Sequence, residues 1–236
     1  MDRKIILYTL AAALMAFIGI MLILSVLPDK RPGFGLYPWH VSRDAAGRVR
    51  VFDLTVGESR LADVRALLGD EGKINLFENP DGSHSVEVYF DNILLSNLQA
   101  DWLVTLDVSE DQLGVMYDRG LRISKTGSGS HKVKLDPADV EQLADTPIRV
   151  LTYLPWKRLE PRDIVGNFGD PAERRTEESG VVHWLYPDKG MDVARDAKGG
   201  VVIQYLNPAD FERAVALLPA PANPRLTPKP VERRLH

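Results

Sequence analysis

Leu98-Gln-Ala-Asp-Trp-Leu-Val-Thr-Leu-Asp-Val108 is the stretch of sequence that decides the fold. Trp102, Val104 and Leu106 alternate in it with a second set of side chains. A period of two places successive side chains on opposite faces of a strand. The sequence therefore predicts a β-strand over residues 98–108 with one face in the core.

The residues before this strand predict two more strands. Residues 73–78 and 85–91 flank the turn sequence Asn-Pro-Asp-Gly at 79–82. A turn of this composition between two alternating runs is a typical hairpin signal. Together with residues 98–108, these segments predict an antiparallel meander of three strands.

A short amphipathic helix is expected in front of the meander. Residues 61–68 gather leucine and valine side chains on one helical face. Ser59 can cap the N-terminus of this helix, and Gly69 can adopt the left-handed conformation that ends it.

The same order of elements recurs 100 residues later. Residues 161–170 share with residues 61–70 an aspartate, a β-branched residue, an apolar residue four positions on, and a final Gly-Asp. The strands that follow in this second copy are expected as short runs at residues 172–176, 181–186, 191–195 and 201–206. We interpret the pattern as a duplication, with chance similarity as the alternative.

Residues 5–27 form an almost wholly apolar run without a charged side chain. A helix of this length reaches about 34 Å, which exceeds a hydrocarbon core of about 30 Å. The alternative is a cleaved signal peptide, whose apolar core is typically about 7–15 residues and ends at a small-x-small site. Residues 24–29 lack such a site, so the sequence predicts an uncleaved membrane anchor.

The side of the membrane is less constrained, because basic pairs flank the apolar run at residues 3–4 and at residues 30–31. Basic flanks favour the cytoplasmic side. The short N-terminal tail resembles the common signal-anchor arrangement, so we expect an anchor in the bacterial inner membrane and a periplasmic domain. The chain has no cysteine, which suits either compartment and excludes a lipid-modified cysteine.

The predicted fold class is α+β, with an N-terminal transmembrane helix followed by two helix-plus-antiparallel-meander units. The chain is expected to divide into a short N-terminal tail (1–4), a transmembrane helix (5–27), a juxtamembrane linker (28–47), a first α+β unit with an inserted hairpin (48–147), a second α+β unit (148–218) and a flexible proline-rich basic tail (219–236).

The charge is distributed unevenly along the chain. The formal net charge is −4, but residues 1–31 carry +2 and residues 219–236 carry +3, which leaves −9 on residues 32–218. An acidic body argues against nucleic acid as a partner, since that binding needs a basic footprint. The tail contains five prolines and is expected to be extended. A solvated tail and a docking peptide are both compatible with this composition.

No catalytic or metal-binding motif stands out. The five histidines include no pair at i, i+3 or i+4 spacing, so neither a metal nor a cofactor is expected. Residues 127–132 imitate a phosphate loop but lack its Gly-Lys-Ser/Thr ending, and they predict a hairpin tip. His183 with Asp188 and Asp192 is the closest group of titratable side chains, and a packed sheet histidine is the alternative.

Large aromatic side chains on the predicted strands are the candidates for protein contact. They are Trp102, Trp184, Tyr186, Tyr89 and Tyr205. Such rings usually belong to the core, but alternation directs some to the other face, and an aromatic sheet face in water is typical of a protein-contact surface. Tyr37 and Trp39, about ten residues past the apolar run, are candidates for the membrane interface.

Three short motifs of the second copy carry a resemblance to a known family. They are Phe-Gly-Asp-Pro at 168–171, His-Trp-Leu-Tyr at 183–186 and Gly-Gly-Val-Val-Ile at 199–203. The pattern resembles the SmpA/OmlA (BamE-like) envelope lipoproteins, and tandem copies of that fold resemble β-lactamase inhibitor proteins. The resemblance implies a non-catalytic, protein-binding module. The chain departs from these lipoproteins in lacking a lipidated cysteine and in having two copies.

The sequence thus predicts a single-pass membrane-anchored envelope protein, with a non-catalytic protein-binding or scaffolding role in cell-envelope assembly or maintenance. Its partners are expected to be the membrane and envelope proteins. One alternative is a periplasmic enzyme acting on peptidoglycan or lipid-linked sugar, with His183 and Asp192 as acid and base. Another is a structural domain that recruits a partner through its basic tail.

Overall fold

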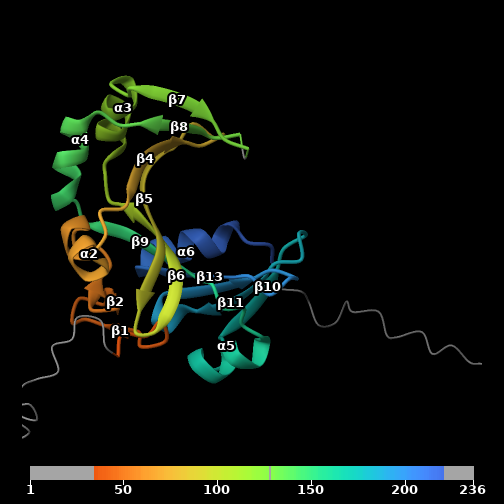
Figure 1. The fold of residues 1–236 in the computed structure, drawn as a ribbon. Coiled ribbons are helices and arrows are strands. Elements are labelled where there is room, and N and C mark those ends of the chain that lie inside the picture. Colours follow the sequence, from red (N-terminus) through yellow and green to blue (C-terminus); the bar gives the residue numbers. More distant parts are fainter. Residues whose placement is uncertain (1–34, 128, 221–236) are drawn as a thin grey trace, which may run out of the picture. The chain divides into compact units, whose positions relative to one another are not determined.

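A computed structural model describes residues 35–127 and 129–220, which contain two antiparallel sheets and five short α-helices (Figure 1). The larger sheet has ten strands in the order β10-β11-β12-β13-β9-β6-β5-β4-β8-β7. Its strands are β4 (Lys73–Glu78), β5 (His84–Leu95), β6 (Leu98–Leu106), β7 (Arg122–Lys125), β8 (His131–Lys134), β9 (Ile148–Pro155), β10 (Glu173–Thr176), β11 (Val182–Tyr186), β12 (Met191–Arg195) and β13 (Val201–Leu206).

The smaller sheet has three strands in the order β1-β2-β3. They are β1 (Ser42–Arg43), β2 (Val49–Val51) and β3 (Leu54–Thr55). The helices are α2 (Leu61–Leu68), α3 (Glu110–Asp118), α4 (Pro137–Gln142), α5 (Pro161–Phe168) and α6 (Pro208–Leu217), with 3₁₀ turns η1 (Leu143–Asp145) and η2 (Pro187–Lys189).

The predicted fold class is wrong, because the described chain is mostly sheet and its meanders do not form separate units. Strand β9 pairs with β6 on one side and with β13 on the other, so a single sheet runs through both predicted units. The first meander has three strands and the second has four. The pairing of β9 joins segments far apart in the sequence, and such pairing partners are not indicated by local alternation.

The predicted transmembrane helix at residues 5–27 lies outside the described residues, as does the N-terminal tail at 1–4. Between residues 35 and 220, apart from the undescribed residue 128, no helix is both long and apolar enough to cross a membrane. For the described residues, the fold class is corrected to a sheet-rich body with short helices.

Helix α2 confirms the predicted bounds 61–68 and its predicted end. Gly69 has a φ of 66°, which is the left-handed conformation expected there. The predicted cap is wrong, because Ser59 Oγ accepts from the backbone N–H of Thr55 in β3, at 2.9 Å. Asp63 instead accepts from the backbone N–H of Arg60 at 2.8 Å, so the first turn is capped from within the helix.

One face of the large sheet, here called the covered face, carries the largest buried rings. Phe90, Trp102, Tyr153 and Ile203 form one row across four strands and are all buried. The small sheet and the apolar sides of α2, α3 and α5 belong to the same hydrophobic cluster as this row. The main core of the protein therefore lies on the covered face.

Phe52, in the β2–β3 turn, connects the small sheet to this core. Its φ is 54° and that of Asp53 is 59°, an uncommon conformation for a bulky side chain. The Phe52 ring centroid lies 4.5 Å from that of Trp102, 5.4 Å from Tyr153 and 6.1 Å from Tyr205. Burial of the ring among three others offsets the cost of the strained backbone.

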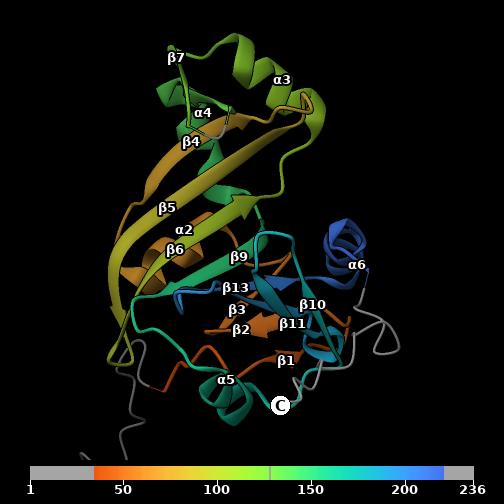
Figure 2. The ribbon, with the colours of Figure 1, turned by 90° about the vertical axis from the view of Figure 1, so that its right-hand side faces the viewer.

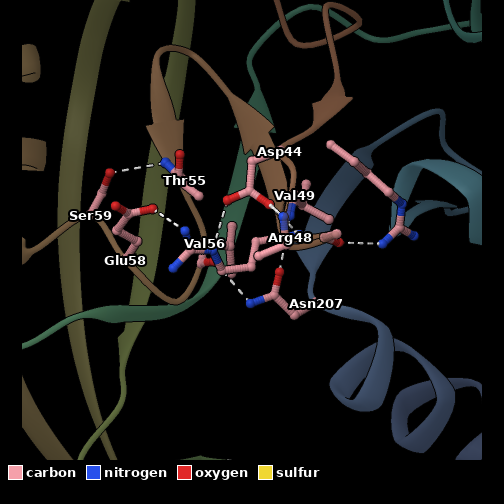
Figure 3. Close-up of polar contacts among 11 residues, drawn as sticks. Asp44, Arg48, Val49, Thr55, Val56, Glu58, Ser59 and Asn207 are labelled. Atoms are coloured by element: carbon pink, nitrogen blue, oxygen red, sulfur yellow. Dashed lines mark hydrogen bonds and ion pairs between the residues drawn. The ribbon is translucent and has the colours of Figure 1, made fainter.

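Asn207, between β13 and α6, holds the small sheet from the other side (Figure 3). Its side-chain oxygen accepts from the Val49 N–H at 3.0 Å, and its amide donates to the Val56 carbonyl at 2.9 Å. Arg48 forms an ion pair with Glu58 in the same region. Asn207 occupies the N-cap position of α6, but its side chain makes no capping hydrogen bond.

The other face of the large sheet, here called the open face, carries one helix among the described residues. Phe211 of α6 packs on Leu185 and Leu206, in a cluster separate from the main core. Figure 1 shows the sheet as an arc with α2, α3 and α4 outside it and α6 inside it, and Figure 2 looks onto the inner side. The open face is therefore concave, and its β4–β5–β6 part has no helix over it.

Candidate protein-binding surface

The open face presents a continuous band of half-buried side chains from β4 to β12. Strand register and alternation place them together, pointing away from the covered face. The members used below are Phe77, Glu87, Tyr89, Asp101, Leu103, Leu154, Ala194 and Val202. The sheet curves toward this side (Figure 1), and these residues are half-buried although no described helix covers the β4–β5–β6 part.

A hollow of about 360 Å³ lies in this band. It is lined by Leu154 of β9 and by Val202 of the adjacent strand β13. Asp101 of β6 and Trp156, which follows β9, also line it. A mainly apolar hollow on a concave sheet face is a typical place for a partner's anchoring side chain.

Asp101 holds two aromatic side chains at the edge of this hollow. Its carboxylate accepts from the Tyr89 hydroxyl at 2.7 Å, from the Asn92 N–H at 2.9 Å and from Trp156 Nε1 at 3.0 Å. Burial alone would raise the pKa of Asp101, but these hydrogen bonds bring it below its ordinary value. The same carboxylate raises the pKa of Tyr89 to about 12. Trp156 is 54% exposed, so a large ring is fixed in position and accessible.

Glu87 is a half-buried carboxylate without a cation beside it in the described part of the chain. Its register neighbours are Asn75 and Thr105, both neutral, and its side chain accepts one hydrogen bond, from Ser85 Oγ at 3.4 Å. Burial raises the pKa of Glu87. Partial burial of an unpaired carboxylate costs free energy, and a cation supplied by a partner would recover it.

His183 lies between two carboxylates on the same face. Its Nδ1 is 2.7 Å from Asp192 Oδ2, and its Nε2 is 3.1 Å from Glu177 Oε1. The hydrogen bond with Asp192 is the main cause that raises the pKa of His183, and Glu177 adds to it. His183 and Asp192 are both buried, and Asp192 Oδ1 has no hydrogen-bond partner.

The structure thus brings together two of the three titratable residues that the sequence grouped. Asp188 is exposed in η2, and its backbone carbonyl accepts from Arg43 Nε at 2.8 Å. Both nitrogens of His183 are within hydrogen-bond distance of carboxylates. Within residues 35–127 and 129–220, no group of three or more His, Cys, Asp or Glu side chains is arranged to hold a metal ion.

Four of the five aromatic contact candidates lie in the core. Trp102, Trp184, Tyr186 and Tyr205 are each at most 4% exposed, on the covered side of the sheet. The strand register aligns these four positions across the sheet, so alternation places all four side chains on the face that the helices and the small sheet cover. Tyr89 alone among the five points to the open face.

The two candidates for the membrane interface pack on the protein itself. The Tyr37 and Trp39 rings are stacked, with centroids 4.9 Å apart, and Trp39 meets the edge of Phe168 at 6.4 Å. Both are half-buried. Their role at a membrane stays a prediction.

Four residues of the surface were not candidates in the sequence: Glu87, Asp101, Trp156 and Glu177. Alternation of residues 85–91 already places Glu87 on the same face as Tyr89, so this one could have been found. The contact between Asp101 and Trp156 joins residues 55 positions apart, and nothing local in the sequence indicates it.

Comparisons with known proteins do not assign the chain to a family. The resemblance to the SmpA/OmlA family, and the envelope role that it implies, therefore stay predictions. A scan against protein-family models finds no match, and neither does a search of curated proteins or of solved structures.

Proposed function

We propose that the protein is a non-catalytic protein-binding module, and that its partner docks on the open face with cationic side chains. The observation that carries the proposal is Glu87, a half-buried carboxylate on an uncovered concave sheet face with no cation beside it among the described residues. In the free protein the Glu87 carboxylate has already lost part of its hydration. A partner's lysine or arginine placed beside it would pair this charge.

The anchors around Glu87 support docking of a protein. Tyr89 and Trp156 are both fixed by Asp101, so little side-chain entropy is lost when a partner packs on them. Leu103 and Phe77 extend the apolar part of the surface on either side. Aromatic anchors surrounded by polar groups are typical of the energetic centre of a protein interface.

The acidic balance of the body supports a basic partner. Residues 32–218 carry a formal charge of −9, which speeds encounter with a positively charged surface and makes association sensitive to salt. The predicted place of action, the bacterial envelope, is kept as part of the proposal.

The test is site-specific photocrosslinking of the full chain in its native cells. A photoreactive amino acid replaces Leu103 on the open face or, as the comparison position, the exposed Val115 on α3. We expect Leu103 to capture one discrete protein with a basic surface, and Val115 to capture none.

Matched charge reversals test whether the capture depends on the charge of Glu87. Glu87→Lys should abolish capture at Leu103, whereas Glu141→Lys, at an exposed position of α4, should leave it unchanged. Equal capture at both positions, or capture that survives Glu87→Lys, would overturn the proposal.

A further inference from the structure

Another hollow, of about 530 Å³, lies at the end of the large sheet beside the β5–β6 turn and the last turn of α5. Four aromatic side chains line it: Trp39, Tyr153, Trp156 and Phe168. Tyr153 belongs to the covered face and Phe168 to the main core, while Trp156 also lines the hollow of the open face. A hollow of this size with mainly apolar walls is suited to an apolar group.

The walls of this hollow are fixed before anything binds. Trp39 is held between the stacked Tyr37 ring and the edge of Phe168. Trp156 donates to Asp101 through Nε1, and its backbone N–H donates to the Gln99 carbonyl in β6 at 3.0 Å. Pre-formed aromatic walls reduce the entropy lost on binding.

Tyr153 adds a polar group to the hollow. The residue is 2% exposed, and its hydroxyl has no hydrogen-bond partner among the described residues. Burial raises the pKa of Tyr153 to about 12, so the hydroxyl keeps its proton and can donate. The hydroxyl oxygen is not itself sealed from solvent, so it can donate to a carbonyl that a ligand brings into the hollow.

Residues 219–236 have the matching chemistry. They contain five prolines and carry a formal charge of +3. Proline fixes φ and has no N–H, so such a segment presents flat rings together with free carbonyl groups. Aromatic-lined grooves recognise proline-rich segments in this way.

The segment is also long enough to reach the hollow. It follows α6, and at about 3.1 Å per residue in an extended form it would span about 55 Å. A body of this size is about 40 Å across. Residues 219–230 alone would span about 37 Å, so this segment can reach a large part of the surface from the end of α6.

We propose that the aromatic hollow binds the chain's own proline-rich segment, residues 219–230, with proline rings against Trp156 and Trp39 and a backbone carbonyl accepting from the Tyr153 hydroxyl. Trp156 also lines the hollow of the open face, but the inference stands on the other walls of the aromatic hollow and does not depend on the proposed function. A second copy's segment, or an unrelated apolar ligand, would give different outcomes in the following test.

The absence of cysteine makes the test clean, because a thiol-reactive crosslinker can join only engineered positions. In the full chain, Thr227→Cys is combined with Lys157→Cys at the rim of the hollow or, as the matched control, with Glu141→Cys on α4. A short bismaleimide should join residues 157 and 227 about tenfold faster than 141 and 227, because docking raises the local concentration. The product is followed by its faster migration on denaturing gels.

Two further variants tie the crosslink to the hollow. Trp156→Ala should remove the difference between the two pairs, and Trp156 is exposed enough that its loss is not expected to unfold the protein. Changing Pro224, Pro228 and Pro230 to Ala alters no residue of the described body and should have the same effect.

Each alternative occupant leaves its own signature. Covalent dimers in place of the intramolecular product would show that a second copy's segment binds, which contradicts the proposal. Equal rates for the two pairs, or a 157–227 rate that survives Trp156→Ala, would show that the segment does not occupy the hollow.

Discussion

The two faces of the large sheet are built from the same strands but are used in opposite ways. The covered face buries Phe90, Trp102 and Tyr153 under the small sheet and the helices. The open face keeps Glu87 and Tyr89 half-buried, with one helix over its far part among the described residues. Stability is therefore supplied mainly from one side, which leaves the other side free to meet a partner.

The two faces also differ in how their polar side chains are paired. On the covered side, Asn207 is paired with backbone groups, and the buried groups without a partner include the neutral Nε1 donors of Trp102 and Trp184. On the open side the incomplete groups are carboxylates: Glu87 has no cation beside it among the described residues, and Asp192 keeps one buried oxygen without a partner. A partly buried carboxylate costs more free energy than a neutral donor, so the open face is the side where a partner's cation would recover the most.

The largest expected effect separates the two faces directly. Phe90→Ala should lower the free energy of unfolding by about 3–5 kcal/mol, because a fully buried ring is removed from a closed core. Phe77→Ala, the matched change on the open face, should cost about 1 kcal/mol, since its ring is already partly in water. Urea denaturation of both variants gives the comparison, and similar losses would contradict the division into two faces.

A smaller effect is expected where the small sheet is attached. Asn207→Ala removes two hydrogen bonds to backbone groups of the small sheet, and should cost about 1–3 kcal/mol. The control is Asn75→Ala on the open face, whose side chain reaches only the carbonyl of Lys73 at 3.4 Å. Denaturation midpoints that change equally for the two variants would show that Asn207 does not hold the small sheet.

The open face should show its own dependence on pH through His183. Its folded pKa is raised, so its stabilisation is fully present below the unfolded pKa of about 6.5 and is lost as pH rises through the folded value. The stability difference between the native chain and His183→Gln should therefore be largest near pH 6 and shrink toward pH 9. The exposed His40→Gln is the control, and a difference that stays constant with pH would contradict the ion-paired histidine.

The smallest expected effect has the opposite sign. Because burial raises the pKa of Glu87, its ionised form destabilises the folded protein, and Glu87→Gln should stabilise it by about 0.5–1 kcal/mol at pH 7. This gain should vanish as pH falls below the unfolded pKa of about 4.3, where the native carboxyl is protonated in both states. A loss of stability at pH 7 would show that Glu87 already has a favourable partner.

The sequence predicted local elements better than their assembly. The helix at 61–68 with its end at Gly69, and the turn at 79–82, follow from spacing and turn residues, and the structure confirms them. Strand β5 is longer than the predicted 85–91, because it continues through an irregularity between Phe90 and Ile93. At this irregularity Asn92 adopts a φ of 59°, and the alternation of the sequence does not indicate such a conformation.

The surface could be predicted only in part for the same reason. Alternation identifies which residues share a face within one strand, but not which face is later covered. Trp102 and Tyr89 are equally plausible contact residues in the sequence, and only the position of the small sheet and helices separates them. The pairing of β9 with both β6 and β13 is likewise a long-range outcome.

The most direct test of the central claim is the affinity of the captured partner for the full chain, measured at two salt concentrations. The account predicts that Glu87→Lys on the open face raises the dissociation constant at least tenfold, a change of about 1.4 kcal/mol, with a loss that is greatest at low salt. Glu141→Lys on the opposite side should change the constant by less than about twofold. Equal effects of the two substitutions, or none from Glu87→Lys, would contradict the open face as the docking surface.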